Sequence, residues 1–328
     1  MKSHMPLENK IVDVVGVGVN ATDTVIRLPR FPVFDSKMQV LSVNQEAGGQ
    51  IASAMVACSR WGLRSRYVGT VGDDDAGRFH REELERCGVE AHLLVSPGVR
   101  SQFSYILIDE PTGERTILWG RDPALVLRPE QLERGWIEGS RLLHVDGHDP
   151  AADAQAARWA RSAGIPVTTD LDNVYPGIES LLEQSDYLLT TAEFPVRLMG
   201  EANPLTALPY FVQRYGCRLA GATLGARGVV AWDGTRFLQC PGFIVKAVDT
   251  TGAGDIFHAG YIYALLAGWD TERCLEFACA AAALNCTRAG ARGGIFPIQE
   301  ILRLAESGER RDAVFSADAL AAAGAKNP

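Results

Sequence analysis

The residues with the clearest chemical potential lie in a single stretch, 248–260, which reads Val-Asp-Thr-Thr-Gly-Ala-Gly-Asp-Ile-Phe-His-Ala-Gly and leads into an apolar segment. Gly252 and Gly254 lack a Cβ, so successive backbone N–H groups can turn toward one point, and the helix that follows adds its unpaired first-turn donors. This arrangement predicts an anion site. Asp255 follows directly, where a bound phosphate would lie, and two negative charges there would repel.

The position of Asp255 makes chemical sense if the phosphate is being transferred and the carboxylate takes a proton from the incoming hydroxyl. The alternative is an aspartate that caps a helix beside a glycine-rich turn. For an isolated G-x-G-D pattern the cap is the better interpretation, because such short patterns recur by accident.

The longer sequence around this pattern favours the catalytic interpretation over the helix cap. Asp-Thr-Thr-Gly-Ala-Gly-Asp, with the Phe and the Ala-Gly that follow, closely resembles the C-terminal signature of the ribokinase, or PfkB, family of carbohydrate kinases. The resemblance implies a sugar kinase that uses ATP and Mg²⁺, with Asp255 as general base. It also implies that Gly252, Ala253 and Gly254 form the anion hole for the transferring phosphoryl group.

The composition fits a folded enzyme of this size. The chain has 328 residues, of which 47% are hydrophobic, and a net charge of −8. This charge disfavours nucleic acid as a partner, since binding to a phosphate backbone needs clustered Lys and Arg. The seven cysteines are odd in number and include no C-x-x-C pair. We therefore expect reduced core cysteines, a cytoplasmic protein, and no membrane segment.

A rival interpretation comes from the start of the chain. A β-branched run at 11–15 is followed by Gly-Val-Gly-Val-Asn-Ala, a G-x-G-x-x-A pattern typical of dinucleotide-binding oxidoreductases. That fingerprint requires a helix to begin at the glycines, whereas the following segment alternates in polarity and contains Pro29 and Pro32. The dehydrogenase interpretation is therefore disfavoured. A P-loop NTPase is disfavoured too, because the chain has no G-x-x-x-x-G-K-[ST].

The remaining pattern predicts an α/β fold with a doubly wound core, in which a mainly parallel sheet is flanked by helices. Two β-rich pieces, 22–46 and 101–119, interrupt this core and are expected to form one small β-sheet lid. The core then comprises 11–21, 47–100 and 120–305 in one kinase domain, 1–328, and 306–328 forms a C-terminal tail. The layout matches the ribokinase-like fold of the family.

Further sites follow from the resemblance. Thr223, Gly225 and Gly228 match the family's nucleotide-facing T-x-G-x-x-G-V loop, and Asn285 corresponds to a position beside adenine. Family members often have Asn-x-x-Glu where this chain has Thr-Thr-Ala-Glu, so only Glu193 remains to organise Mg²⁺ through water.

A monovalent cation site is also implied by the resemblance. In related kinases the aspartate at the position of Asp249 and the loop near Gly290 hold such a cation, and Thr251 lies in the same turn. We therefore expect activation by K⁺.

The acceptor is expected to be a neutral polyhydroxy compound. Asp23 and Asp35 have the spacing of two sugar-binding aspartates in ketohexokinase-like members, and a carboxylate can accept two hydroxyl hydrogen bonds at once. The paired glycines and the start of the next helix are expected to complete this site, at Gly48, Gly49, Gln50 and Ser53. A phosphorylated or sulfonated sugar is the alternative, which would use nearby cations, namely Lys37, Arg115 and Arg121.

Other possibilities are a nucleoside kinase on the same scaffold and a sugar-binding protein without activity, the latter opposed by the retained Asp255 and glycines. His144 and His148 with their neighbouring aspartates have a spacing that suits a metal on a helix, but Gly147 and the strand context oppose it, so no transition-metal site is predicted. The exposed edges of the lid predict a homodimer.

Overall fold

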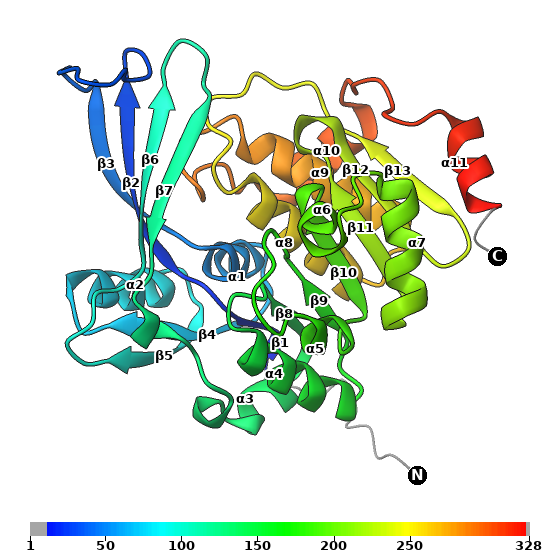
Figure 1. Ribbon diagram of the computed structural model, residues 1–328, viewed down its shortest axis with the longest axis horizontal. Helices are drawn as coiled ribbons and strands as arrows, with labels where there is room; N and C mark the ends of the chain where they lie inside the picture. Colours follow the sequence, from blue (N-terminus) through cyan, green and yellow to red (C-terminus); the bar gives the residue numbers. More distant parts are fainter. Residues whose placement is uncertain (1–11, 326–328) are drawn as a thin grey trace.

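The computed structural model describes residues 12–325. Its centre is a nine-stranded sheet with the order β13-β12-β11-β10-β9-β8-β1-β4-β5 (Figure 1). The strands from β5 to β11 pair in parallel, and β12 and β13 add an antiparallel edge. The predicted α/β fold, a mainly parallel sheet flanked by helices, is confirmed.

The inner strands of the large sheet are short and buried, as expected for strands that are covered on both faces, whereas the edge strand β5 is partly exposed. In chain order they are β1 (Val12–Val17), β4 (Ser65–Gly72), β5 (Glu90–Ser96), β8 (Ser140–Val145), β9 (Val167–Thr169), β10 (Tyr187–Thr191), β11 (Leu219–Thr223), β12 (Gly228–Trp232) and β13 (Phe237–Pro241).

Helices cover both faces of this sheet, each over its own hydrophobic core. One face carries α1 (Gln50–Arg60), α2 (Asp75–Arg86), α8 (Ala253–Leu266), α9 (Thr271–Asn285) and α10 (Ile298–Ser307). The other carries α3 (Arg134–Glu138), α4 (Pro150–Ser162), α5 (Glu179–Leu182), α6 (Glu193–Met199), α7 (Pro204–Tyr215) and α11 (Ala317–Gly324). The described residues also include the 3₁₀ turns η2 (Pro123–Leu125), η3 (Pro129–Gln131) and η4 (Gly225–Arg227).

The small sheet has four strands in the order β3-β2-β6-β7. They are β2 (Ala21–Leu28), β3 (Ser42–Gly48), β6 (Phe103–Asp109) and β7 (Arg115–Gly120). The parallel pairing of β2 with β6 joins the two β-rich pieces that the sequence placed in one sheet. This sheet projects from one side of the core, and the loop before α8 extends toward β7 (Figure 1).

The segment after α10, expected to be a tail, packs against the core as far as it is described. Phe243 forms a bridge with Arg310, Phe315 lies against the second core, and α11 contacts α7 and β13. Within residues 12–325, no helix is long and apolar enough to cross a membrane.

Candidate active site

The site lies at the carboxyl ends of the parallel strands, where open α/β sheets bind ligands. Its centre is the turn into α8. Gly252 adopts φ +73°, and a Cβ placed there would lie 2.3 Å from the carbonyl oxygen of Ala291. Only glycine fits this close approach without strain. The turn leads into the first-turn N–H groups of a 14-residue helix, the part of the backbone from which the predicted anion hole would be built.

Asp255 lies in the first turn of α8. Burial, with the nearby charges of Asp170 and Asp23, raises the pKa of this carboxyl to about 8, and Arg292 and a hydrogen bond with Ser53 oppose the shift. A carboxyl with this pKa accepts a proton more readily than an ordinary aspartate, which suits a general base working near neutral pH.

Asp249 connects the loop before α8 to the loop at Gly290 through hydrogen bonds. Its Oδ1 accepts a hydrogen bond from the N–H of Thr251, and its Oδ2 accepts one from the N–H of Gly290, both at 2.9 Å. The carboxylate is buried and forms no ion pair with any residue that the structure describes. The hydroxyl of Thr251 is also buried without a hydrogen-bond partner. A buried carboxylate beside a free hydroxyl fits a bound cation such as K⁺.

Asn285 does not have the position predicted for it. Its side chain is fully buried and donates to the carbonyls of Thr251 and Ala291, both at 3.2 Å, while its Oδ1 accepts from Gly294 at 3.1 Å. These bonds occupy the amide, so Asn285 connects the two loops around the anion hole and has no exposed atom for a nucleotide.

A cavity of about 600 Å³ opens beside the anion hole. This volume lies in the range of pockets that hold cofactor-sized molecules. Its walls include the N-terminal residues Ala253 and Gly254 of α8 and apolar residues of α9. The predicted nucleotide and Mg²⁺ residues also line it, namely Thr223, Gly225, Gly228 and Glu193. Glu193 is exposed there, and a carboxylate oxygen is a ligand that suits Mg²⁺.

Asp23 is close enough to Asp255 for its charge to raise the pKa of that carboxyl. It is buried on β2 and accepts a hydrogen bond from the hydroxyl of Ser104 at 2.5 Å. Burial raises the pKa of Asp23 above its ordinary value, and a hydrogen bond from Ser104 and the charge of Arg292 oppose this shift. A Cβ on Gly48 would meet the Asp23 carboxylate at 2.0 Å, so the glycine leaves the room that this side chain occupies.

The glycine pair starts α1. Gly49 has φ +91°, and a Cβ there would lie 2.4 Å from the Cα of Asn20. Gln50 lies near Asp170 and helps to lower the pKa of that carboxyl, and the fully buried Ser53 acts in the same way on Asp255.

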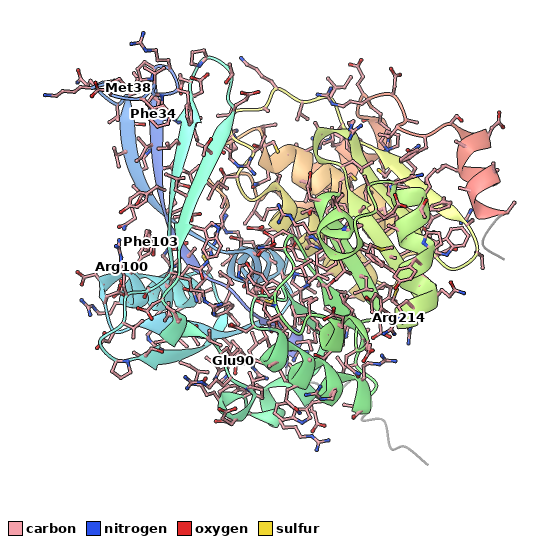
Figure 2. All side chains as sticks on the ribbon, in the orientation of Figure 1. Phe34, Met38, Glu90, Arg100, Phe103 and Arg214 are labelled. Carbon is pink, nitrogen blue, oxygen red and sulfur yellow. The ribbon has the colours of Figure 1, made fainter. Side chains whose placement is uncertain are left out.

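The structure does not bring Asp35 to this site. Asp35 is exposed in the loop between β2 and β3, with φ +56°. Phe34 and Met38, on either side of it, lie at the free tip of the small sheet (Figure 2). Asp23 pairs near the base of the same sheet, opposite Glu46. Within one chain, Asp23 and Asp35 therefore do not lie in the same site, because the loop carries Asp35 away from the core.

Arg292 is a site residue that the sequence analysis missed. Its side chain is buried, and it donates from Nε to Ser53 at 3.1 Å and from Nη2 to the carbonyl of Gly48 at 3.0 Å. The sequence offers one indication of this role: Arg292 is a single charged residue within the loop of small residues that follows Gly290. Two of the three cations proposed for an anionic acceptor have other partners: Arg121 pairs with Asp149, and Arg115 donates to Thr250. Lys37 is exposed in the same loop as Asp35.

This geometry can be compared with known proteins. The family model for the pfkB family of carbohydrate kinases matches residues 10–298. The chain belongs to this family. The predicted family and its carbohydrate-kinase class are thereby confirmed.

Relatives of this pfkB-family chain agree on the fold. An ATP-dependent ribose-1-phosphate kinase of Halopiger xanaduensis is 32% identical over 289 residues, covering 86% of this chain and 94% of that one. The crystal structure of a "putative ribokinase" from Agrobacterium tumefaciens has a TM-score of 0.84 at 30% identity, covering 90% and 97% of the two chains. An E. coli "putative Ribokinase II" in complex with ATP and Mg²⁺ has a TM-score of 0.78 at 20% identity, covering 90% and 99%.

Proposed function

We propose that this protein transfers the γ-phosphoryl group of ATP to a hydroxyl of a monosaccharide, with Asp255 as the general base. The observation that carries the proposal is the position of Asp255 in the first turn of α8, whose N-terminal residues face the 600 Å³ cavity. Phosphates would reach the anion hole from this cavity, and the acceptor hydroxyl would come from the side of Asp23 and Ser53. In-line transfer would then have the two reactants on opposite sides of the transferred group.

The roles of the other residues follow. The N–H groups at 252–254 would stabilise charge that develops on the phosphoryl oxygens. Thr223, Gly225 and Gly228 would contact the nucleotide, and Glu193 would hold Mg²⁺ through water. Bound Mg²⁺ would neutralise phosphate charge. The complex of the E. coli relative with ATP and Mg²⁺ supports both cofactors.

Release of ADP tests this function. Purified protein with Mg²⁺ and ATP is offered monosaccharides, sugar phosphates and nucleosides, and ADP is measured by a coupled assay. Release that depends on a sugar or sugar phosphate supports the proposal. Release only with nucleosides would instead identify a nucleoside kinase, and no release with any acceptor would contradict the assignment of a kinase.

Among sugars, we expect a neutral acceptor to have a higher kcat/KM than its phosphate. Asp23 and Glu46 place negative charge on the acceptor side, and Asp23 has no ion-pair partner among the described residues. Asp23→Ala should raise KM about tenfold or more, the loss expected for a hydrogen bond to a charged group. Asp35→Ala is the control within the small sheet. A KM unchanged by Asp23→Ala would contradict this role.

A second candidate, a sugar-phosphate kinase, is favoured by one residue and one relative. Arg292 is buried next to Ser53, its Nη1 has no hydrogen-bond partner, and the relative from Halopiger xanaduensis is a ribose-1-phosphate kinase. Ribose and ribose 1-phosphate therefore belong in one comparison. A higher kcat/KM for the phosphate, lost in Arg292→Met, would establish this candidate in place of the neutral acceptor.

Potassium should activate the enzyme. A cation beside Asp249 and Thr251 would balance the buried carboxylate and fix the loop that shapes the anion hole. The measurement compares kcat in K⁺ with kcat in tetramethylammonium at equal ionic strength, for the wild type and for Asp249→Asn. Equal rates in the two salts for the wild type would rule out the cation site.

The small sheet supports a homodimer. Its edge strand β7 has exposed apolar side chains on both faces, among them Ile117, Leu118 and Trp119, and Tyr105 of β6 is exposed too. Single chains seldom leave so many large apolar groups in water. A second copy of the sheet is the partner that we propose for this surface.

A further inference from the structure

Three polar side chains that the proposed mechanism does not use meet in the interior beneath the anion hole. His144 comes from β8, Asp170 follows β9, and His258 lies on α8. All three are almost fully buried, with exposures of 0%, 4% and 3%. One possible ligand atom from each lies within 4.8 Å of the other two. Segments far apart in the sequence thus bring two imidazoles and one carboxylate to a single point.

The hydrogen bonds of His144 fix the direction of its ring. The hydroxyl of Thr168 donates to the carbonyl of Leu143 at 3.3 Å, so its oxygen is free to accept from Nδ1 of His144 at 3.0 Å. We assign the proton to Nδ1 on this ground, which leaves a lone pair on Nε2. That nitrogen is buried and has no partner. Histidines that bind metals are commonly oriented in this way, with the other ring nitrogen donating to a nearby oxygen.

His144 is also in the correct protonation state. Burial, with the neighbouring His258, lowers the pKa of its imidazole to about 3, so the ring is neutral at physiological pH. Neutral imidazole is the form that binds metals.

His258 and Asp170 complete the set. The Nε2 of His258 lies 3.0 Å from Oδ1 of Asp170, and Nδ1 of His258 is buried without a partner. With both rings neutral, the Asp170 carboxylate is the charged group of this cluster, and either a proton on His258 or a bound cation would balance it in the interior.

We propose that His144, Asp170 and His258 form a binding site for a divalent transition-metal ion of the Zn²⁺ type. Two nitrogens and one carboxylate oxygen form a typical ligand set for Zn²⁺, whereas Mg²⁺ and Ca²⁺ prefer oxygen ligands alone. Nε2 of His144 is buried without a partner, and an ion shared with Asp170 and Nε2 of His258 would satisfy it. This site is separate from the Mg²⁺ that accompanies ATP at the exposed Glu193.

The ion would have a structural role close to the reaction centre. His258 lies one helical turn after Asp255 on α8. An ion bound there would join this turn of α8 to the carboxyl ends of β8 and β9, and so hold the base in place relative to the sheet. Metal binding itself does not depend on the proposed kinase activity.

The test uses the full-length protein and Zn²⁺ as the probe. After incubation with Zn²⁺ and removal of the excess, elemental analysis should find about one Zn²⁺ per chain, and Mg²⁺ in excess should not displace it. His144→Gln and His258→Gln should each abolish this stoichiometric binding. His80→Gln is the matched control, because His80 is also fully buried with one unpartnered ring nitrogen but lies beside Thr22 instead of the cluster. Zinc loss in His80→Gln as well would contradict the assignment.

A second measurement needs no variant and excludes the seven cysteines as ligands. X-ray absorption of the Zn²⁺-loaded wild type should show only nitrogen and oxygen neighbours, at about 2.0–2.2 Å. Sulfur neighbours, or a wild type that retains only trace zinc, would overturn the proposal. Both results stand whether or not the protein phosphorylates a sugar, so failure here is distinct from failure of the proposed function.

Discussion

Asp255→Asn lowers kcat by about 10²–10⁴-fold, the range typical for loss of a general base. Asparagine keeps the size of the side chain and can still hydrogen-bond with Ser53, so the fold should persist. Nucleotide binding should persist too, because the described walls of the cavity do not include Asp255. The measurements are steady-state kcat and the Kd for ATP.

The pH profile gives the Asp255 prediction a second readout. A protonated carboxyl cannot accept the hydroxyl proton, so kcat/KM of the wild type without bound Zn²⁺ should rise with pH through a midpoint near 8, the pKa of Asp255 in the free enzyme. Asp255→Asn should lack this rise.

Asp75→Asn is the matched control for the substituted base. Asp75 also lies in the first turn of a helix, α2, but its side chain is 96% exposed and distant from the chemistry. Its substitution should leave kcat unchanged. Wild-type turnover in a folded Asp255→Asn variant would show that another group is the base.

Gly252→Ala should lower kcat by about 10²–10³-fold, the usual cost of losing a donor to the developing charge. The added Cβ would collide with the backbone of Ala291, and relief of this collision must move the turn that aims the N–H groups. The measurement is kcat together with the Tm of the variant.

Gly268→Ala separates this effect from backbone strain alone. Gly268 has nearly the same conformation, φ +76° against +73°, but no atom lies within 4 Å of the position that an added Cβ would take. Both variants should lose about 1 kcal/mol of stability from the unfavourable φ. Only Gly252→Ala should lose activity, and equal kcat values in the two variants would argue against a precise role for the turn.

Local patterns in the sequence determined much of this protein. The β-branched runs and their alternation with helices predicted the parallel sheet, and the segments at 22–46 and 101–119 predicted the second sheet. The two sheets were predicted correctly because apolar periodicity and strand length act over a few residues, so neighbours in sequence are sufficient to specify them. The turn at 249–255 predicts where an anion could bind, and this stays a prediction.

Other features were decided by contacts between distant segments. Arg292 meets Ser53 across 239 residues, and Asn285 turns inward because two loops offer it backbone partners. Asp35 is carried to the tip of the small sheet, although its spacing from Asp23 suggested a shared site. His144, Asp170 and His258 meet only when β8, β9 and α8 pack together. The pKa of Asp255 depends on the same packing, since burial and the charges of Asp170 and Asp23 act through space and leave no trace in local sequence.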